Sequence, residues 1–304
     1  MESPGLYVQW QAIGDFVGAV KAMVPLPFKQ YYWAALEVWQ SPTLWALLAM
    51  AFVWERWRPA RPSQPLFSRG MGQDVLWFNL DILINLAFIP AVGGALRLLY
   101  DALTGGARFP IVAQWPVAAQ VTFTVFVVDF LFYLKHRMVH RVESLWNFHA
   151  IHHSQRELNG FTDYRQHTFE HVLAQGVVLL PAVIMGLKPY SVMSVSAALW
   201  IHTFLIHGNI RSNFGWLGHL VISPQYHRIH HSIELRHRDR NFGTVTPLWD
   251  RLFGTYYHAG KDEYPATGVE DVEFVPPKTL KPQAWLVDMG RQMWHPFRRI
   301  LKLP

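Results

Sequence analysis

Residues 134–154, LKHRMVHRVESLWNFHAIHHS, contain two tightly spaced histidine clusters, HRMVH and HAIHH. A third cluster, HRIHH, lies at residues 227–231. The three clusters hold half of the chain's 16 histidines: His136, His140, His149, His152, His153, His227, His230 and His231. Neutral imidazole is the commonest metal ligand and suits iron, zinc, copper and nickel. Because eight nitrogens are too many for one tetrahedral zinc ion, the clusters predict a site for two metals.

The composition of the 304-residue chain is strongly apolar. Hydrophobic residues make up 51% of it and charged residues only 16%, whereas ordinary soluble domains have about 25% charged residues. The 14 tryptophans suit membrane interfaces, and the net charge of +6 fits an anionic membrane better than nucleic acid. The chain has no cysteine, which excludes disulfides, thiolate catalysis and cysteine-ligated iron–sulfur clusters within it. Because no basic stretch precedes an apolar run at the N-terminus, we expect no cleaved signal peptide.

Apolar segments predict an all-α fold, an integral membrane helical bundle of about four to five spans. The predicted spans are residues 42–57, 75–100, 117–134, 172–187 and 191–206. The first is short for a hydrocarbon layer of about 30 Å, and Asp81 requires that one face of the second points into the protein. Residues 285–301 predict a basic amphipathic helix that lies either on the membrane or on the chain's own soluble part.

Four regions follow from this pattern. They are an interfacial N-terminal segment (1–40), the first membrane spans and loops (41–116), a catalytic region with the three clusters (117–260) and a C-terminal tail (261–304). Arginines and lysines follow the spans that end near residues 57 and 134, which places both ends in the cytoplasm by the positive-inside rule. We therefore expect a histidine-rich helical cap on the cytoplasmic face, where the two-metal site lies at the ends of spans.

The spacing within each cluster indicates which imidazoles share a helix face. His136 and His140 are four residues apart and share one. In each HxxHH pattern the first two histidines are three residues apart and share a face, while the third follows directly. One cluster can therefore supply ligands to two metals. Alternatively, it can supply two ligands to one metal while its third histidine points inward. Asp129 and Tyr133 fall on the same helical stripe as His136, and we take both as candidate catalytic residues. Asp129 would either support a ligand histidine or make a helix–helix contact.

Three motifs in this order resemble the fatty acid hydroxylase/sterol desaturase superfamily of histidine-rich, non-haem di-iron membrane enzymes. They are LKHRMVHRVESLWNFHAIHHS, PQYHRIHHS and DRNFGTVTPLWDRLFGT, and the resemblance covers roughly residues 120–260. It implies that the eight clustered histidines bind iron. It also implies a ninth ligand at His207 in HGN, with His167 and His202 as further candidate ligands. His167 lies in RQHTFE, where Thr168 replaces the proline of the family pattern. The third motif is expected to be structural or to support ligands, and its Asn241 is a third candidate catalytic residue.

The chemistry of two imidazole-bound ferrous ions agrees with this resemblance. Such a centre can reduce O₂ and take hydrogen from an unactivated C–H bond, and the ends of membrane spans are well placed to receive lipids. We therefore expect O₂-dependent oxidation of a fatty acyl, sterol-like or other lipid, with hydroxylation favoured over desaturation. Since no dinucleotide fingerprint or haem domain is visible, the electrons must come from an external donor of the cytochrome b5, ferredoxin or reductase type.

Two other functions compete with lipid oxidation. A redox-inactive, histidine-rich zinc enzyme would also use imidazoles, but the chain has no HExxH motif. A membrane metal-binding or transport protein would place its ligands at mid-membrane, whereas these clusters lie at the ends of spans. The three readings differ in the metal that they require and in whether a lipid is changed.

Overall fold

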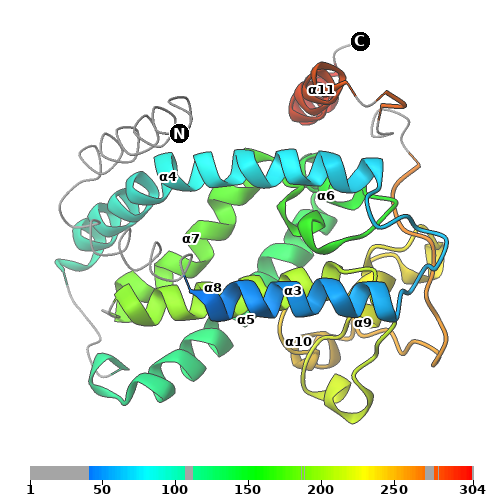
Figure 1. Cartoon of the computed structure of the whole chain (residues 1–304). Coiled ribbons are helices and arrows are strands. Elements are labelled where there is room, and N and C mark those ends of the chain that lie inside the picture. The colour runs from blue at the N-terminus through cyan, green and yellow to red at the C-terminus, as the bar shows by residue number, and fades with distance from the viewer. Residues whose placement is uncertain are drawn as a thin grey trace, which may run out of the picture.

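The regular structure is helical throughout the described residues. The computed structural model describes residues 41–106, 112–185, 187, 189–270, 277–279 and 281–302, so the predicted interfacial segment 1–40 lies outside it. The main helices are shown in Figure 1: α3 (Pro42–Trp57), α4 (Arg69–Thr104), α5 (Val117–Arg141), α6 (Glu143–His153), α7 (Thr168–Met185), α8 (Pro189–His207), α9 (Pro224–His230), α10 (Leu248–Leu252) and α11 (Pro282–Ile300). Short 3-10 helices lie at Val112–Gln114 (η1), Gly160–Tyr164 (η2), Gly215–His219 (η3) and Leu235–His237 (η4). The expected all-α class is confirmed for this part of the chain.

All five predicted spans fall on helices, but their number as membrane spans is not confirmed. Within the described residues, α5 and α7 are long and apolar enough to cross a membrane, judged by length and composition. The 16 residues of α3 extend only about 24 Å, less than a hydrocarbon layer. In α8, a shorter apolar stretch covers Ser194–His207. The structure therefore supplies two candidate membrane-spanning helices.

The helices pack around α7 and α8. α7 contacts α4, α5 and α8, and α8 contacts α3, α5 and α9. Their shared core contains Val128, Leu179 and Val195, and full burial of each such side chain stabilises the fold by about 1.5–3 kcal/mol. Figure 1 shows α9 and α10 at the end of the bundle where α3 stops and α4 starts. The histidine clusters are thus carried at one end of the long helices.

The polar face of α4 points into the protein, as its sequence predicts. Asp81 Oδ1 lies 2.6 Å from His171 Nδ1 of α7. Two turns earlier, the carboxylate of Asp74 accepts a hydrogen bond from Arg165 Nε at 2.6 Å. Its other oxygen accepts hydrogen bonds from Gln155, Asn159 and Thr162. Because Asp74 and Arg165 are fully buried, this network fixes the segment that follows α6 against α4.

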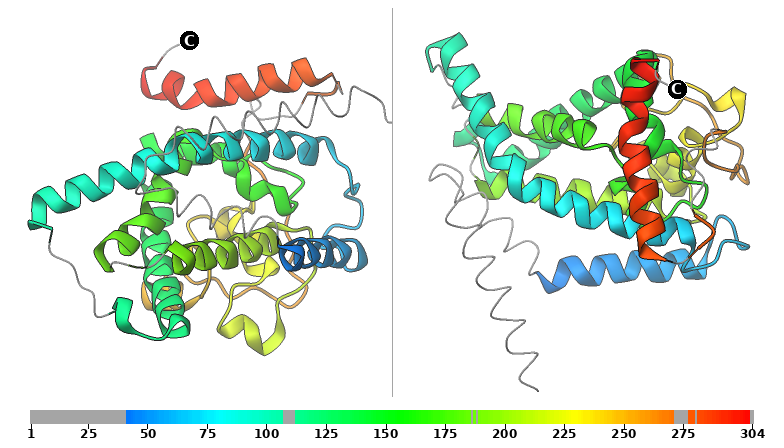
Figure 2. Two further views of the ribbon diagram at one scale, coloured as in Figure 1. Left: turned by 60° about the vertical axis from the view of Figure 1, so that its left-hand side comes forward. Right: turned by 90° about the horizontal axis from the view of Figure 1, so that it is seen from above.

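α11 packs across the bundle on one face and leaves an apolar face exposed. Met289 and Met293 pack against Trp77 of α4 and Ile151 of α6, and Figure 2 shows the helix lying across α4. Arg165 Nη1 donates to Gln292 Oε1 at 3.3 Å, which ties α11 to the Asp74 network. The opposite face exposes apolar side chains of Leu286, Val287, Trp294, Phe297, Ile300 and Leu301. The reading in which the helix packs on its own protein is confirmed, and contact of the outer face with a membrane stays a prediction.

Candidate metal centre

Nine histidines converge at the end of the bundle. They come from the C-terminal ends of α5 and α8 and from the short helices α6 and α9. The sequence fixes where α9 begins: Pro224 occupies its first turn and Ser223 Oγ accepts a hydrogen bond from Tyr226 N at 3.2 Å. The imidazoles form two groups, and within each group the ligand atoms all lie within 4.8 Å of one another.

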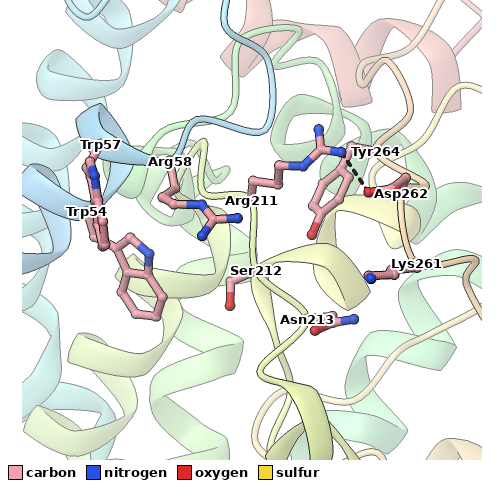
Figure 3. A pocket seen from close by; sticks show the side chains of 9 residues that line it. All are labelled: Trp54, Trp57, Arg58, Arg211, Ser212, Asn213, Lys261, Asp262 and Tyr264. Atoms are coloured by element: carbon pink, nitrogen blue, oxygen red, sulfur yellow. Dashed lines mark hydrogen bonds and ion pairs between the residues drawn. The ribbon is translucent and has the colours of Figure 1, made fainter.

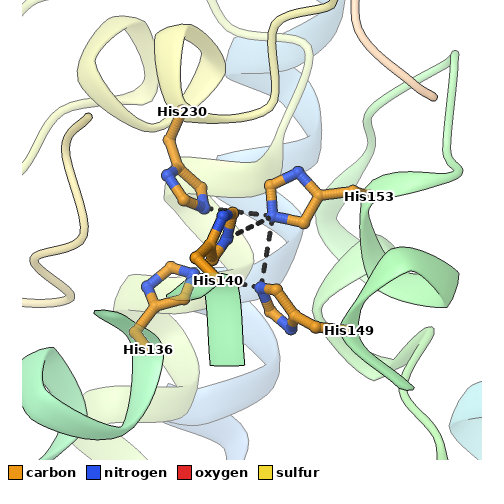
Figure 4. A group of neighbouring side chains, drawn as sticks. All are labelled: His136, His140, His149, His153 and His230. Carbon is orange, nitrogen blue, oxygen red and sulfur yellow. Dashed lines mark hydrogen bonds between the residues drawn. The ribbon is translucent and has the colours of Figure 1, made fainter. Parts of the chain in front are cut away.

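The five-histidine group consists of His136, His140, His149, His153 and His230 (Figure 4). His149 Nε2 lies 3.1 Å from His136 Nε2 and 3.2 Å from His153 Nε2. His153 Nε2 is also 3.2 Å from His140 Nε2 and 3.1 Å from His230 Nε2. The five rings therefore aim the same nitrogen at one point.

The four-histidine group consists of His152, His207, His227 and His231. His207 Nε2 lies 2.8 Å from His227 Nε2 and 3.2 Å from His152 Nε2, and His231 Nε2 is 3.1 Å from His227 Nε2. The ring of His231 stacks on that of His153 at a centroid distance of 4.3 Å, so the two groups are adjacent. The structure thus places His207, the predicted ninth ligand, beside clustered histidines from α6 and α9.

Each HxxHH cluster is divided between the two groups. His149 and His153 of α6 point into the five-histidine group, and His152 points into the other. His227 and His231 point into the four-histidine group, and His230 crosses to the five-histidine group. Of the two arrangements that the spacing left open, the structure has the one in which a single cluster contributes histidines to both groups. Histidines four residues apart share a group here, because the middle histidine turns to the neighbouring one.

Hydrogen bonds on the far side of several rings fix their tautomers. His136 Nδ1 donates to the carbonyl oxygen of Phe242 at 2.8 Å, and His230 Nδ1 donates to that of Arg240 at 2.9 Å. His207 Nδ1 donates to the Thr203 carbonyl at 2.7 Å. A carbonyl accepts only, so each Nδ1 carries the proton and each Nε2 offers a lone pair. This arrangement orients neutral imidazoles for metal binding.

A single loop supplies two of these carbonyls. Asp239 and Asn241 adopt left-handed backbone conformations (φ +56° and +61°), which turn the carbonyl groups of residues 240 and 242 toward the histidines. The carboxylate of Asp250 accepts hydrogen bonds from the backbone N–H groups of Phe242 and Gly243 at 2.8 and 2.6 Å. The third sequence motif is therefore structural and supports the five-histidine group through its backbone.

Glu170 is a functional residue that the sequence analysis missed. Its Oε1 accepts hydrogen bonds from His149 Nδ1 at 2.7 Å and from Lys135 Nζ at 2.6 Å. All three side chains are buried. Glu170 is the last residue of the RQHTFE element. A carboxylate within that motif was the sequence signal that could have indicated it. Glu170 gives the five-histidine group a carboxylate–histidine pair.

His167 and His202 are not brought into either group. His167 Nε2 donates to the carbonyl of Met293 in α11 at 3.1 Å, and its Nδ1 accepts from Phe169 N at 3.0 Å. Both of its ring nitrogens are therefore used in protein hydrogen bonds. His202 lies one turn and a half before His207 on α8, but it is absent from both groups. The structure gives neither residue the position expected of a metal ligand.

The three candidate catalytic residues are bonded elsewhere. Asp129 accepts hydrogen bonds from the backbone N–H groups of residues 245 and 246 and from Trp249 Nε1, rather than from a histidine. The Tyr133 hydroxyl lies 3.0 Å from Thr255 Oγ1. Asn241 Nδ2 donates to the Tyr226 carbonyl at 3.2 Å. All three hold the third motif in place, because each bonds to that motif or belongs to it.

Burial favours the neutral form of several clustered imidazoles. It lowers the pKa of His152, His153, His227 and His231 well below the usual 6.5, and neighbouring histidines lower it further. Burial also lowers the pKa of His230, to about 3, although its hydrogen bond to the Arg240 carbonyl opposes the shift. Neutral imidazoles are the form that binds metals.

The donor set fits two metal ions. Two lone-pair nitrogens repel one another when they approach closely, and a shared cation removes that repulsion. Ligand nitrogens about 2.1 Å from a metal and at right angles lie about 3.0 Å apart, against about 3.4 Å for tetrahedral angles. The observed separations of 2.8–3.2 Å match the right-angled arrangement. Nδ1 of His152, His227 and His231 is buried without a hydrogen-bond partner among the described residues. The Nε2 atom of each of these rings lies within the four-histidine group.

Comparison with known proteins identifies the region that carries the centre. Residues 121–255 match the family model described as fatty acid hydroxylase. An ornithine lipid hydroxylase of Rhizobium tropici is 31% identical over 145 residues, which is 48% of this chain and 44% of that protein. An alkylglycerol monooxygenase of Caenorhabditis elegans is 31% identical over 148 residues (48% and 29%). Methylsterol monooxygenase 2-2 of Arabidopsis thaliana is 24% identical over 187 residues (59% and 64%).

The matches concern the histidine-bearing region rather than whole proteins. The chain spans less than half the length of the first two relatives. No solved structure matches it. All nine grouped histidines, Glu170 and the third motif fall within the matched segment 121–255. The similarity to the fatty acid hydroxylase family therefore covers the segment of the chain that carries both histidine groups.

Proposed function

We propose that this protein is a membrane-bound, non-haem di-iron oxygenase that hydroxylates a lipid with O₂. The observation that carries the proposal is the pair of adjacent groups, in which nine buried imidazoles direct Nε2 at two points. The two apolar helices α5 and α7 support attachment to a membrane, since each is long enough to cross one. The cytoplasmic position of the groups follows from loop charges and is part of the proposal.

Two bound iron ions would supply the reductive activation of O₂ and the removal of hydrogen from an unactivated C–H bond. The protein's own residues have three tasks there. The Nε2 atoms of the nine histidines would hold the metals. Glu170 and the carbonyls of Phe242, Arg240 and Thr203 keep the protons of four rings on Nδ1. Burial of the rings excludes water from the ligands.

The relatives favour hydroxylation and a lipid substrate. Their names describe hydroxylation or monooxygenation of an ornithine lipid, an alkylglycerol and a methylsterol. Each is a lipid, and none of the three is named a desaturase. We therefore keep hydroxylation ahead of desaturation. An external donor of the cytochrome b5, ferredoxin or reductase type would supply the electrons.

The test combines metal analysis with lipid analysis on the full chain in a membrane. We expect two irons per chain and a membrane lipid that gains one oxygen atom. His149→Ala should abolish the oxidised lipid, whereas His258→Ala, which removes an exposed histidine outside both groups, should not. Zinc in place of iron would support the redox-inactive alternative. Two irons without any changed lipid would favour metal storage or transport.

A further inference from the structure

A basic pocket lies at the end of α3, outside the two histidine groups. It encloses about 350 Å³ and is lined by Trp54, Trp57, Arg58, Arg211, Ser212, Asn213, Lys261, Asp262 and Tyr264. In Figure 3, Arg58 from one side and Lys261 from the other extend toward the space above Ser212 and Asn213. Three chain segments thus bring cations and aromatic rings to one hollow.

The charge of the pocket favours an anion. Its lining has three cations and one carboxylate, a net charge of +2. Asp262 Oδ1 accepts a hydrogen bond from Arg211 Nη2 at 2.8 Å, and the same guanidinium lies over the ring of Tyr264 at 5.0 Å. Among the described residues, Arg58 and Lys261 have no carboxylate within ion-pair distance. Two cations are therefore available to a ligand.

A buried cation behind the pocket adds to this field. Arg228 of α9 is only 2% exposed, and its Nε and Nη1 have no hydrogen-bond partner in the described part of the chain. It interacts electrostatically with Tyr264 of the pocket wall and with the buried carboxylate of Glu55. Because it interacts with Tyr264 of the pocket wall, its charge adds to the positive potential there.

An apolar stripe on α3 runs up to the pocket. Met50, Val53 and Trp57 are spaced by three and four residues on α3 and are 58%, 65% and 76% exposed. The stripe ends at the pocket, because Trp57 also lines it. Tryptophan at the boundary between an apolar face and charged groups is typical of the membrane interface. A molecule with a charged head and an apolar chain fits this surface.

Short stretches of chain connect the pocket to the four-histidine group. Arg211 follows His207 by four residues, and its backbone N–H donates to the Arg58 carbonyl at 2.7 Å. Gln225, two residues before His227, donates through Nε2 to the carbonyls of Gly260 and Lys261 at 2.8 and 3.3 Å. The chain therefore connects the pocket to two proposed ligands over a few residues on each side.

We propose that this pocket binds the anionic head group of a membrane lipid, with phosphate or carboxylate oxygens between Arg58 and Lys261 and the acyl chain along α3. The proposal rests on the proposed function in one respect, since a head group held here would position its lipid beside the four-histidine group for oxidation. The aromatic rim and the apolar stripe favour a lipid over a free anion.

Native mass spectrometry of the full iron-loaded chain in detergent tests this assignment. The probes are dioleoyl phosphatidylglycerol, dioleoyl phosphatidylcholine and inorganic phosphate. We expect the phosphatidylglycerol to bind more tightly than the phosphatidylcholine, and inorganic phosphate not to displace it. Arg58→Gln and Lys261→Gln should each weaken phosphatidylglycerol binding about tenfold, since each removes a charge-assisted hydrogen bond. Arg238→Gln removes an exposed arginine outside the pocket and should change nothing.

The Asp262→Asn variant controls for the possibility that the Arg58 and Lys261 variants bind lipid weakly because they unfold. Removing the only carboxylate of the pocket should strengthen phosphatidylglycerol binding several-fold, a gain that unfolding cannot imitate. Equal binding of both lipids, displacement by inorganic phosphate, or variants that match Arg238→Gln would each overturn the proposal. Iron content measured on the same samples keeps the two proposals apart. A chain that takes up no iron on loading but still binds the anionic lipid through Arg58 would refute the oxygenase and leave the pocket intact.

Discussion

Replacement of Glu170 by glutamine separates the two roles that its carboxylate plays. Glu170 Oε1 accepts hydrogen bonds from His149 Nδ1 at 2.7 Å and from Lys135 Nζ at 2.6 Å. The side chains of Lys135 and Glu170 are only 9% and 2% exposed. Glutamine keeps an oxygen that can accept from His149 but removes the negative charge. His149 then becomes a weaker donor ligand, and Lys135 becomes a buried cation without its counterion.

The two losses have different magnitudes. Loss of a hydrogen-bonded partner behind a ligand histidine weakens metal binding by about 10- to 100-fold, which corresponds to about 1.4–2.7 kcal/mol. Removing one partner of a buried ion pair destabilises the fold by about 3–5 kcal/mol, because the other charge stays buried. We therefore expect Glu170→Gln to release iron at a 10- to 100-fold lower chelator concentration and to unfold at a lower temperature.

The double variant Lys135→Met/Glu170→Gln distinguishes the effects. Methionine fills the space of the lysine stem without a charge, so the double variant should recover most of the thermal stability. It should not recover iron affinity, since His149 still lacks its carboxylate. The assay is iron content during chelator titration, with thermal unfolding of the same samples. Wild-type chelator resistance in Glu170→Gln would refute the role assigned to the carboxylate, as would full recovery of iron affinity in the double variant.

Three further predictions follow from the structure. His227→Ala removes a ligand from the four-histidine group alone, so metal analysis should find about one iron per chain, and a value of zero or two would contradict the division into groups. Asp74→Asn leaves the buried Arg165 unpaired and should cost about 3–5 kcal/mol of stability; an unchanged unfolding temperature would exclude this. In the unfolded chain a histidine takes up a proton below about pH 6.5, whereas in the folded protein the pKa of His230 is about 3. Between pH 6.5 and pH 3 the unfolded state therefore binds more protons, so the free energy of unfolding should fall as the pH is lowered. Thermal unfolding of the chelator-treated protein at pH 7 and pH 5 measures this loss of stability. The loss should be smaller in His230→Gln than in the wild type, by at most about 1.4 kcal/mol per pH unit. Equal losses in the two proteins would contradict the lowered pKa of His230.

The sequence predicted the helices and most of the centre because these depend on local patterns. Apolar periodicity located all five long helical segments, and clustering of histidines located eight of the nine grouped imidazoles. His207 came from the resemblance to a family, since a lone histidine at the end of a helix carries no pattern of its own. Asp81 was correctly expected to face inward, because an exposed carboxylate in an apolar helix is costly.

What the sequence could not show depends on how the helices pack. The division of HAIHH and HRIHH depends on two groups lying side by side, so that the middle histidine of each cluster turns to its neighbour. The spacing of histidines along one helix does not indicate that a second histidine group lies beside the first. His167 was misassigned for a related reason, because its ring is taken up by the backbone of α11, which lies 126 residues away in sequence.

The closing motif shows why residue types alone misplaced the catalytic candidates. Asp129 was expected either to support a histidine or to make a helix–helix contact, and its carboxylate instead accepts hydrogen bonds from the backbone of Val245 and Thr246. The same loop, held by Asp250 at Phe242 and Gly243, presents the carbonyl groups that orient His136 and His230. Carboxylates thus act on two ligands through a rigid backbone rather than by contact. A carbonyl is present at every residue, so no side-chain pattern can reveal which ones orient a ligand; only the fold of the loop selects them.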